Sequence, residues 1–163
     1  MTPERHWMAT MLMVGGLLAE CSADPKAGPV AHWTMTEPAG ATLLADSSGH
    51  GRTATLQGGV STGQGACNNA ASFPGDTAAL ATFQAPALHS FTVAAWVKVA
   101  GLGNGDKPYP RIIEWPGSLL HVTRGDHEGL NLTFWAGKGC WGCSGRSFGL
   151  GEWAHVAGTY DCS

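Results

Sequence analysis

Two segments of the chain show the alternation of apolar and other side chains that a β-strand with one buried face requires. Between residues 90 and 99, one face carries Phe91, Val93, Ala95, Val97 and Val99, and the other carries Thr92, Ala94, Trp96 and Lys98. Residues 152–161 form the second segment, in which Trp153, His155, Ala157 and Thr159 share a face. A period of two positions is typical of a strand that lies against a core. Both segments are therefore predicted to be inner strands of a sheet.

Three shorter strands are predicted between these two segments, at residues 111–115, 119–122 and 130–135. In the last of them Leu130, Leu132 and Phe134 face inward, and a glycine-bounded turn at residues 125–129 makes it a hairpin with the strand before. Residues 101–110 are rich in Gly and Pro and are predicted to be a loop.

The composition favours the same all-β class. The 163 residues are enough for one domain, since single domains commonly run to about 100–200 residues. Only 13% of the residues are charged and 24 are glycine, which fits short strands joined by tight turns. The net charge of −3 provides no basic surface, so nucleic-acid partners are not expected.

The N-terminal residues 1–21 are predicted to be an export signal. Arg5 and His6 precede an apolar run from Trp7 to Ala19, which is too short for a membrane-spanning helix. Cys21 resembles the lipidated cysteine of bacterial lipoproteins, although Glu20 replaces the small residue usual before it; the alternative is an ordinary cysteine. Residues 22–29, rich in Pro and small side chains, are predicted to be a tether. The protein is then exported to the cell envelope or beyond, lipid-anchored if Cys21 is modified.

Two further segments complete a family resemblance. Residues 31–37 look like an opening strand, and residues 46–56 carry an Asp-Ser-Ser-Gly-x-Gly turn followed by a strand. With the two inner strands, they appear in the order of the laminin-G-like family, within the concanavalin A-like lectins and glucanases. The resemblance implies an antiparallel two-sheet jelly-roll sandwich for residues 30–163. That fold hosts sugar-binding modules, adhesion modules and glycanases, so it does not name a function.

The chain departs from this family in two places. Residues 73–79 read Phe-Pro-Gly-Asp-Thr-Ala-Ala, where the family carries an acidic cluster. The chain also stops at Ser163, where the family continues with further strands. A jelly roll needs about eight strands to cover its inner faces. We therefore expect an incomplete domain, either a fragment or a truncated reading frame, rather than a minimal one.

Cysteines other than Cys21 are expected to form disulfides in an exported chain. The candidates are Cys67, Cys140, Cys143 and Cys162, which allow three pairings. Cys140 and Cys143 lie in a glycine-rich segment that is predicted to be a loop. They either form a disulfide that closes this loop or pair with distant cysteines such as Cys67. A zinc site is disfavoured because the sequence lacks a second pair of ligands. Redox chemistry is disfavoured because the segment is not predicted to begin a helix.

The sequence does not predict an enzyme. Glycanases of this fold place two carboxylates on one strand in a Glu-x-Asp-x-x-Glu run, which this chain lacks. Glu114 stands alone, and Asp126, His127 and Glu128 read as a solvated turn. His155 is predicted to be a structural histidine that hydrogen-bonds across the sheet.

Two tryptophans are the candidate ligand-binding residues. Trp135 faces away from the apolar stripe of its strand, and Trp141 follows in the cysteine-containing segment. Exposed rings of this kind can stack on the C–H face of a sugar, whereas the alternative is that both pack under further strands. Trp33, Trp96 and Trp153 are expected to be buried in framework strands.

The family resemblance also implies a structural calcium ion. Asp46, Glu37 and Asp161 are the candidate ligands by residue type. For Asp46 the alternative is an Asx-turn without metal.

The sequence thus predicts an exported, non-catalytic module that binds polysaccharide, a cell-surface glycan or a protein. The alternatives are a glycan-active enzyme whose catalytic part is absent or diverged, and a structural adhesion or spacer module.

Overall fold

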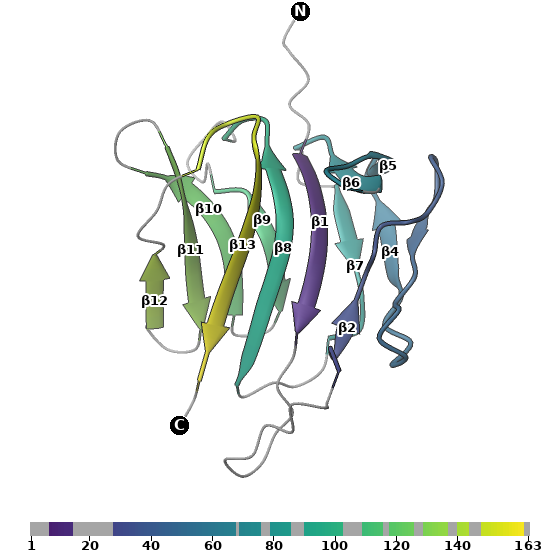
Figure 1. Ribbon diagram of the computed structural model, residues 1–163, viewed down its shortest axis with the longest axis horizontal. Helices are drawn as coiled ribbons and strands as arrows, with labels where there is room; N and C mark the ends of the chain where they lie inside the picture. Colours follow the sequence, from purple (N-terminus) through teal and green to yellow (C-terminus); the bar gives the residue numbers. More distant parts are fainter. Residues whose placement is uncertain are drawn as a thin grey trace, which may run out of the picture.

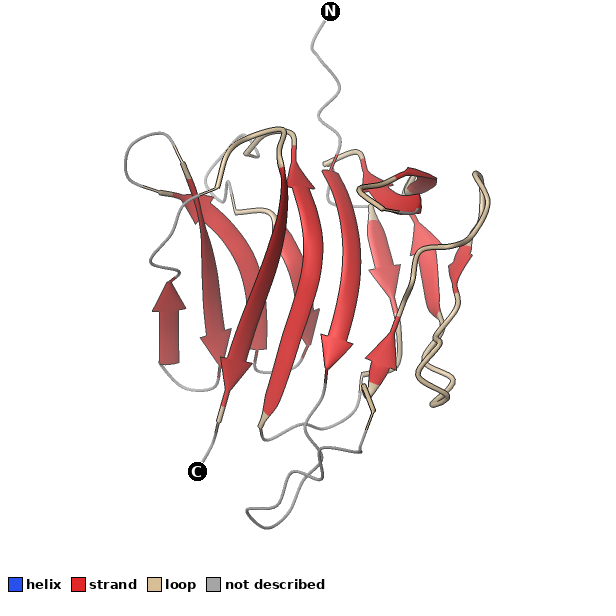
Figure 2. Ribbon diagram, viewed as in Figure 1, coloured by secondary structure: helices blue, strands red, loops and turns tan. Residues whose placement is uncertain are grey.

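The strands predicted from alternation form the centre of an all-β structure (Figures 1 and 2). The computed structural model describes residues 7–14, 28–67, 69–75, 79–85, 90–102, 109–115, 118–125, 129–136, 140–143 and 148–161. Within these ranges the chain forms strands, turns and loops without a helix, and the paired strands are antiparallel. The predicted all-β, antiparallel architecture is confirmed.

The first sheet lies nearest the viewer in Figure 1. Its strand order is β13 (Trp153–Tyr160), β8 (Phe91–Val99), β1 (Trp7–Val14), β6 (Asn69–Phe73) and β5 (Ser61–Gln64), and β2 (Ala31–His32) also pairs with β1.

Two smaller sheets lie behind the first (Figure 1). The second sheet has the order β12 (Cys140–Cys143), β11 (Leu130–Ala136), β10 (Ser118–Arg124) and β9 (Arg111–Trp115). The third has the order β3 (Leu43–Leu44), β4 (Ala54–Gln57) and β7 (Leu80–Thr82).

The core lies between the layers, and β8 supplies its centre. The apolar face predicted for this strand is buried, with exposed fractions of 3% or less for Phe91, Val93, Ala95, Val97 and Val99. The same core cluster contains Leu120 and Leu132 from the second sheet and Leu44 and Leu56 from the third. The first sheet therefore covers both of the others, as the sandwich prediction requires.

Strand β13 approaches the second sheet closely at Gly158. A Cβ atom at this position would lie 3.2 Å from the Phe134 ring and 3.3 Å from a Leu120 methyl group. Both distances are tighter than ordinary van der Waals contact, so a residue without a side chain fits best there.

The N-terminal apolar segment has a place in the first sheet. Residues Trp7–Val14 form β1, which pairs with β8 along its whole length and with β6 and β2 on its other side. The sequence predicts that the same residues lie within an export signal. Export stays a prediction.

The structure departs from the predicted elements in two places. Regular pairing of the opening strand covers only Ala31–His32 rather than residues 31–37, and Met35 has a positive φ of 54°. The prediction of a loop around Cys140 is wrong, because residues 140–143 pair with β11 at four positions as β12. Among the described residues there is no helix long and apolar enough to cross a membrane.

Candidate ligand-binding site

The second sheet has one face in the core and one face turned away from it. Leu120 and Val122 of β10 and Leu130 of β11 are buried in the core clusters. The residues between them alternate to the opposite side. We call this side the outer face of the second sheet; it carries Arg111, Glu114, Leu119, His121, Thr123, Asn131, Thr133 and Trp135.

The strand register places the two predicted tryptophans at directly opposed positions. Trp135 of β11 pairs with Leu119 on one side and with Trp141 of β12 on the other. Opposed residues of neighbouring strands share a face of the sheet, with Cβ atoms about 4.5–5.5 Å apart. Trp135 is partly exposed, and the side chain of Trp141 lies outside the described residues. Positions 135 and 141 are therefore adjacent on the outer face.

A polar row runs beside the tryptophan positions. Thr133 pairs with His121, and His121 pairs with Arg111, where a β-bulge shifts the register. The Thr123 and Thr133 hydroxyls lie 3.0 Å apart in a hydrogen bond. Arg111 and Glu114 form an ion pair at the exposed rim of the sheet. The face therefore combines a large aromatic residue with hydroxyl, guanidinium and carboxylate groups.

His121 is the buried polar centre of this row. Its side chain is 5% exposed, and its ring centroid lies 5.6 Å from that of Tyr109, which is itself 49% exposed. Burial, and after it the charge of Arg111, lowers the pKa of the His121 imidazole, so the ring is neutral at pH 7. Sequence reasoning missed His121, Tyr109 and Arg111, because the bulge that aligns Arg111 with His121 leaves no mark in the alternation pattern.

The Asp46 side chain stabilises the turn at residues 46–52 and connects it to β2. One carboxylate oxygen accepts hydrogen bonds from the backbone amides of His32 and Ser48, both at 2.9 Å. The other accepts from the Ser48 hydroxyl and from the Arg52 amide, both at 2.8 Å. Gly49 and Gly51 have positive φ angles of 89° and 70° in this turn, which glycine adopts without strain.

The pKa of Asp46 reflects this hydrogen bonding. Partial burial alone would raise the pKa of the carboxyl group, but the bonds from the Ser48 hydroxyl and from the three backbone amides outweigh it. The pKa of Asp46 therefore lies well below its usual range. The arrangement is an extended Asx-turn, the alternative that the sequence analysis left open beside a metal ligand.

The three predicted calcium ligands do not form one ligand set. Both oxygens of Asp46 already accept two hydrogen bonds each. Glu37 accepts from the Ala45 amide at 2.7 Å, and its second oxygen is buried without a hydrogen-bond partner. Asp161 accepts from the Ser90 hydroxyl beyond the end of β13.

The sheet order separates these acids. Asp46 bonds to β2, which lies three strand positions from β13, or about 14 Å at 4.8 Å per strand. The described part of the chain contains no cluster of three His, Cys, Asp or Glu residues able to hold a metal ion. These residues do not fit a shared calcium ion, and calcium at any one of them stays a prediction.

The strand β12 limits which of the predicted disulfides can form. Cys67 is an exposed, free thiol. Cys140 and Cys143 open and close one strand, which separates their Cα atoms by about 10 Å at 3.3 Å per residue. That separation exceeds the roughly 7 Å limit for a disulfide, so the two cannot be bridged to each other in this strand. Cys21 and Cys162 lie outside the described residues, as do Asp126, His127 and Glu128.

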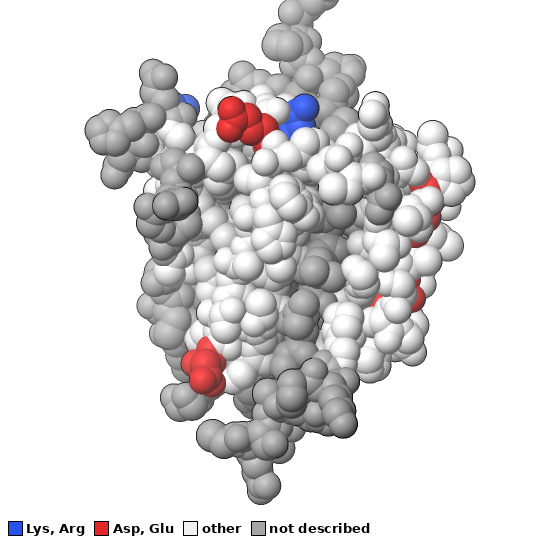
Figure 3. All heavy atoms as spheres, viewed as in Figure 1, with Lys and Arg blue, Asp and Glu red and all other residues white. Residues whose placement is uncertain are grey.

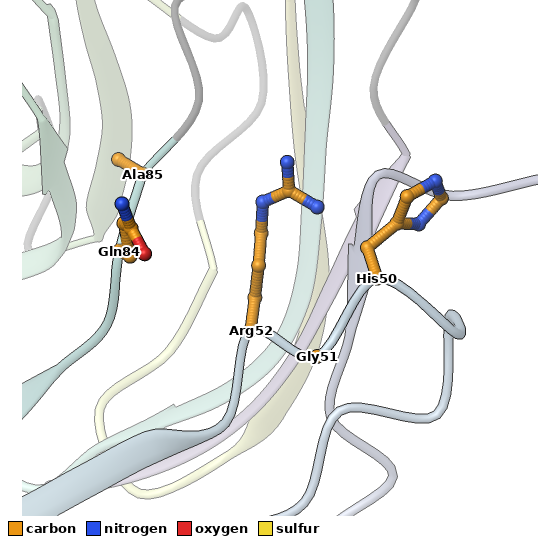
Figure 4. Close-up of a pocket in the computed structure, with 5 residues that line it drawn as sticks. All are labelled: His50, Gly51, Arg52, Gln84 and Ala85. Carbon is orange, nitrogen blue, oxygen red and sulfur yellow. The ribbon is translucent and has the colours of Figure 1, made fainter.

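An open hollow of about 230 Å³ lies beside the Asp46 turn and is lined by His50, Gly51, Arg52, Gln84 and Ala85. Figure 4 shows the Arg52 side chain extended along the hollow, with the His50 ring turned away from it. Arg52 donates a hydrogen bond from its guanidinium group to the Val30 carbonyl at 3.1 Å. The arginine therefore stabilises the local fold.

Two tryptophans of the framework strands, Trp33 and Trp96, differ in burial. Trp33 is 1% exposed and donates its ring N–H to the Arg52 carbonyl at 2.9 Å, as expected of a buried residue. Trp96 is 40% exposed on the outer face of the first sheet, so the expectation that it is buried is wrong. His155 is exposed and contacts the Trp96 ring. The charged atoms in Figure 3 lie at the margins of the face over β8 and β13.

The antiparallel two-layer arrangement of these strands is that of a jelly-roll sandwich. A family model described as concanavalin A-like lectin/glucanases superfamily, of the third laminin-G type, matches residues 72–163, more than half of the chain. The chain therefore belongs to this superfamily. No curated protein and no solved structure matches the chain. The family match contains both inner strands and the whole second sheet.

Proposed function

We propose that the protein is an exported, non-catalytic module that binds carbohydrate on the outer face of its second sheet. The observation that carries this proposal is the register of β11 and β12, which aligns Trp135 with Trp141. Two adjacent aromatic positions offer a platform for the C–H faces of sugar rings. A saccharide with two or more units could span both.

The neighbouring polar groups support the same ligand class. Thr123, Arg111 and Glu114 lie on the same face as Trp135 and offer hydroxyl, donor and acceptor groups to sugar hydroxyls. His121 is neutral and buried beneath Tyr109, so it contributes to the packing of this face and adds no charge to it. A face of this kind suits a neutral or weakly charged glycan of the cell surface.

The binding experiment compares two tryptophans that are both partly exposed. Addition of polysaccharide should quench or shift the tryptophan fluorescence of the wild type. Trp135→Ala should weaken binding at least about 10-fold, the equivalent of roughly 1.4 kcal/mol for one stacking contact, while the thermal transition stays nearly unchanged. Trp96→Ala is the matched control, because Trp96 lies on the other sheet. Equal losses in both variants, or no binding by the wild type on a glycan array, would contradict the proposal.

Export is tested separately from binding. In a Gram-negative host, the mature protein should lack residues 1–20 by mass spectrometry and should partition into detergent if Cys21 is lipidated. A soluble periplasmic product removes lipidation and leaves export standing. A cytoplasmic product that retains Met1 contradicts export.

A further inference from the structure

Tyr109 precedes β9, and its ring lies on the outer face of the second sheet. The ring is tilted by 32° over the ring of His121, with 5.6 Å between the centroids, and about half of the residue is exposed. Trp135 pairs with Leu119, two positions before His121 on β10. At about 4.8 Å between strands and about 3.3 Å per residue, the Trp135 and His121 positions are about 8 Å apart. The outer face therefore carries a second exposed ring within reach of the first.

The backbone around Tyr109 fixes the place of this ring. The next residue is Pro110, which restricts residue 109 to an extended backbone. The Pro110 carbonyl accepts a hydrogen bond from the Val122 amide at 2.9 Å, so the segment is held beside β10. Tyrosine offers a large contact area with few rotatable bonds, and a ring already in position loses little entropy when it binds. Tyr109 is therefore suited to stack on a ligand.

A β-bulge in β9 brings Arg111 and Glu114 to the same face as Tyr109. Residues three apart on a regular strand point to opposite faces. In β9 the register passes over Ile112, which packs against both core clusters. Arg111 and Glu114 consequently share the outer face, where they form an ion pair with about half of each side chain exposed. Hydrogen-bond donors and acceptors thus lie side by side at this rim of the sheet.

An ion pair of this kind favours a neutral sugar. A guanidinium group only donates hydrogen bonds and an ionised carboxylate only accepts them, whereas a hydroxyl group does both. Neighbouring hydroxyls of one sugar ring can therefore bind Arg111 and Glu114 together, and an exposed ion pair costs little to open. An anionic sugar would be repelled by Glu114 and would have to replace it at Arg111.

We infer that Tyr109, Arg111 and Glu114 form a second subsite, which takes a neutral sugar unit of the same saccharide that stacks on Trp135. This inference deepens the carbohydrate binding proposed above and rests on it. Additional strands pair with a sheet through the backbone groups of its edges, whereas these side chains stand on its face. The subsite therefore does not depend on which strands lie at the edges.

The first test measures how affinity depends on the length of the saccharide. Neutral oligosaccharides of increasing length are prepared by partial hydrolysis of the polysaccharide that the wild type binds on the glycan array, and binding is measured by calorimetry. Tyr109→Leu keeps an apolar side chain over His121 and removes the flat ring. It should bind the longest oligosaccharide about 10-fold more weakly than the wild type and the shortest one almost equally well. Trp135→Ala should lose affinity at every length, and Tyr109→Phe should retain the wild-type profile.

The second test concerns charge. The probes are the same neutral polysaccharide and polygalacturonate, a polymer of anionic sugar units. The wild type should bind the neutral polymer at least about 10-fold more tightly, and Glu114→Gln, which removes the repelling charge, should reduce this preference.

Failure of this inference and failure of the proposed function give different results. A wild type that binds no carbohydrate on the array overturns both. If Trp135→Ala weakens binding but Tyr109→Leu weakens it equally at every length, or at none, the second subsite alone is overturned. A wild type that binds polygalacturonate as tightly as the neutral polymer overturns the assignment of a neutral sugar to the subsite.

Discussion

The ring of Trp96 on β8 meets the ring of His155 on β13 nearly edge-on, with centroids 5.3 Å apart and planes inclined by 60°. The two residues are directly opposed in the strand register. Four residues further along each strand, Thr92 and Thr159 are hydrogen-bonded through their hydroxyls at 3.1 Å. The solvent-facing side of this strand pair is thus held by side-chain contacts as well as by the backbone ladder.

We expect Trp96 and His155 to be energetically coupled. In a double-mutant cycle of Trp96→Ala and His155→Ala, the coupling in the free energy of unfolding should be about 0.5–1 kcal/mol, the range for aromatic cross-strand pairs. Urea denaturation of the four proteins measures it. A cycle of Trp96→Ala with His50→Ala is the control, since His50 lies in the Asp46 turn and not on β8 or β13. Additive effects at Trp96 and His155 would show that the ring contact contributes nothing.

Gly158 should tolerate no side chain. Gly158→Val would drive Cβ and two methyl groups against Phe134 and Leu120, and we expect a loss of about 1–3 kcal/mol in the free energy of unfolding. Ala157→Val is the matched control, because Ala157 is exposed on the neighbouring position of β13. Thermal denaturation distinguishes the two variants. Equal transition temperatures would mean that β13 does not pack as closely as its geometry indicates.

Asp46→Asn should destabilise the protein by about 2 kcal/mol or more. An amide offers one acceptor oxygen in place of two, so two of the four part-buried donors lose their acceptor and the other two lose a charged one. Asp161→Asn, at an exposed position, should cost far less.

The same carboxylate should make stability acid-sensitive. Because the pKa of Asp46 is lowered on folding, its contribution is fully present above the unfolded value of about 3.9 and is lost as pH falls below it. The wild type should therefore lose stability more steeply than Asp46→Asn below pH 4 in urea titrations. Parallel curves would contradict the assignment.

Calcium should have little effect on stability. Since Asp46 is saturated by hydrogen bonds and Asp161 lies beyond the end of β13, neither addition of Ca²⁺ nor of a chelator should move the transition temperature by more than about 1 °C. A concentration-dependent rise would follow from specific binding to the native state. That rise, if abolished by Glu37→Gln, would place a calcium ion at Glu37.

His121 should destabilise the native state as the solution becomes mildly acidic. Its pKa is lowered on folding, so the unfolded chain takes up a proton first and stability falls as pH drops below about 6.5. The drop in transition temperature between pH 7.5 and 5.5 should be smaller in His121→Gln than in the wild type. His50→Gln, at an exposed position, should retain the wild-type drop.

The sequence predicted those parts of the fold that depend on alternation along one strand. The buried face of β8 and the inward residues of β11 were read from their period of two, because each such strand has one face in the core. The Asx-turn at Asp46 was among the predicted alternatives, since its geometry is set by residues close in sequence.

Features that depend on pairing between strands escaped prediction. Cys140 and Cys143 looked like loop residues because glycine surrounds them, and only β11 makes their segment a strand. Trp96 stands on the polar face of its own alternation pattern, which was a usable signal for exposure, but its contact with His155 depends on the register of β13. The alignment of Arg111 with His121 depends on a β-bulge, which no local sequence pattern predicts.

The turn at Asp46 also bears on the order in which the chain folds. Its bond to His32 closes a loop of 14 residues, whereas the Thr92–Thr159 contact between β8 and β13 joins residues 67 apart. Closing the longer loop costs more chain entropy, and contacts of long sequence separation slow folding. The Asp46 turn should thus be native before β13 docks, and a chain stalled at that stage would expose the edge of β8 to other molecules.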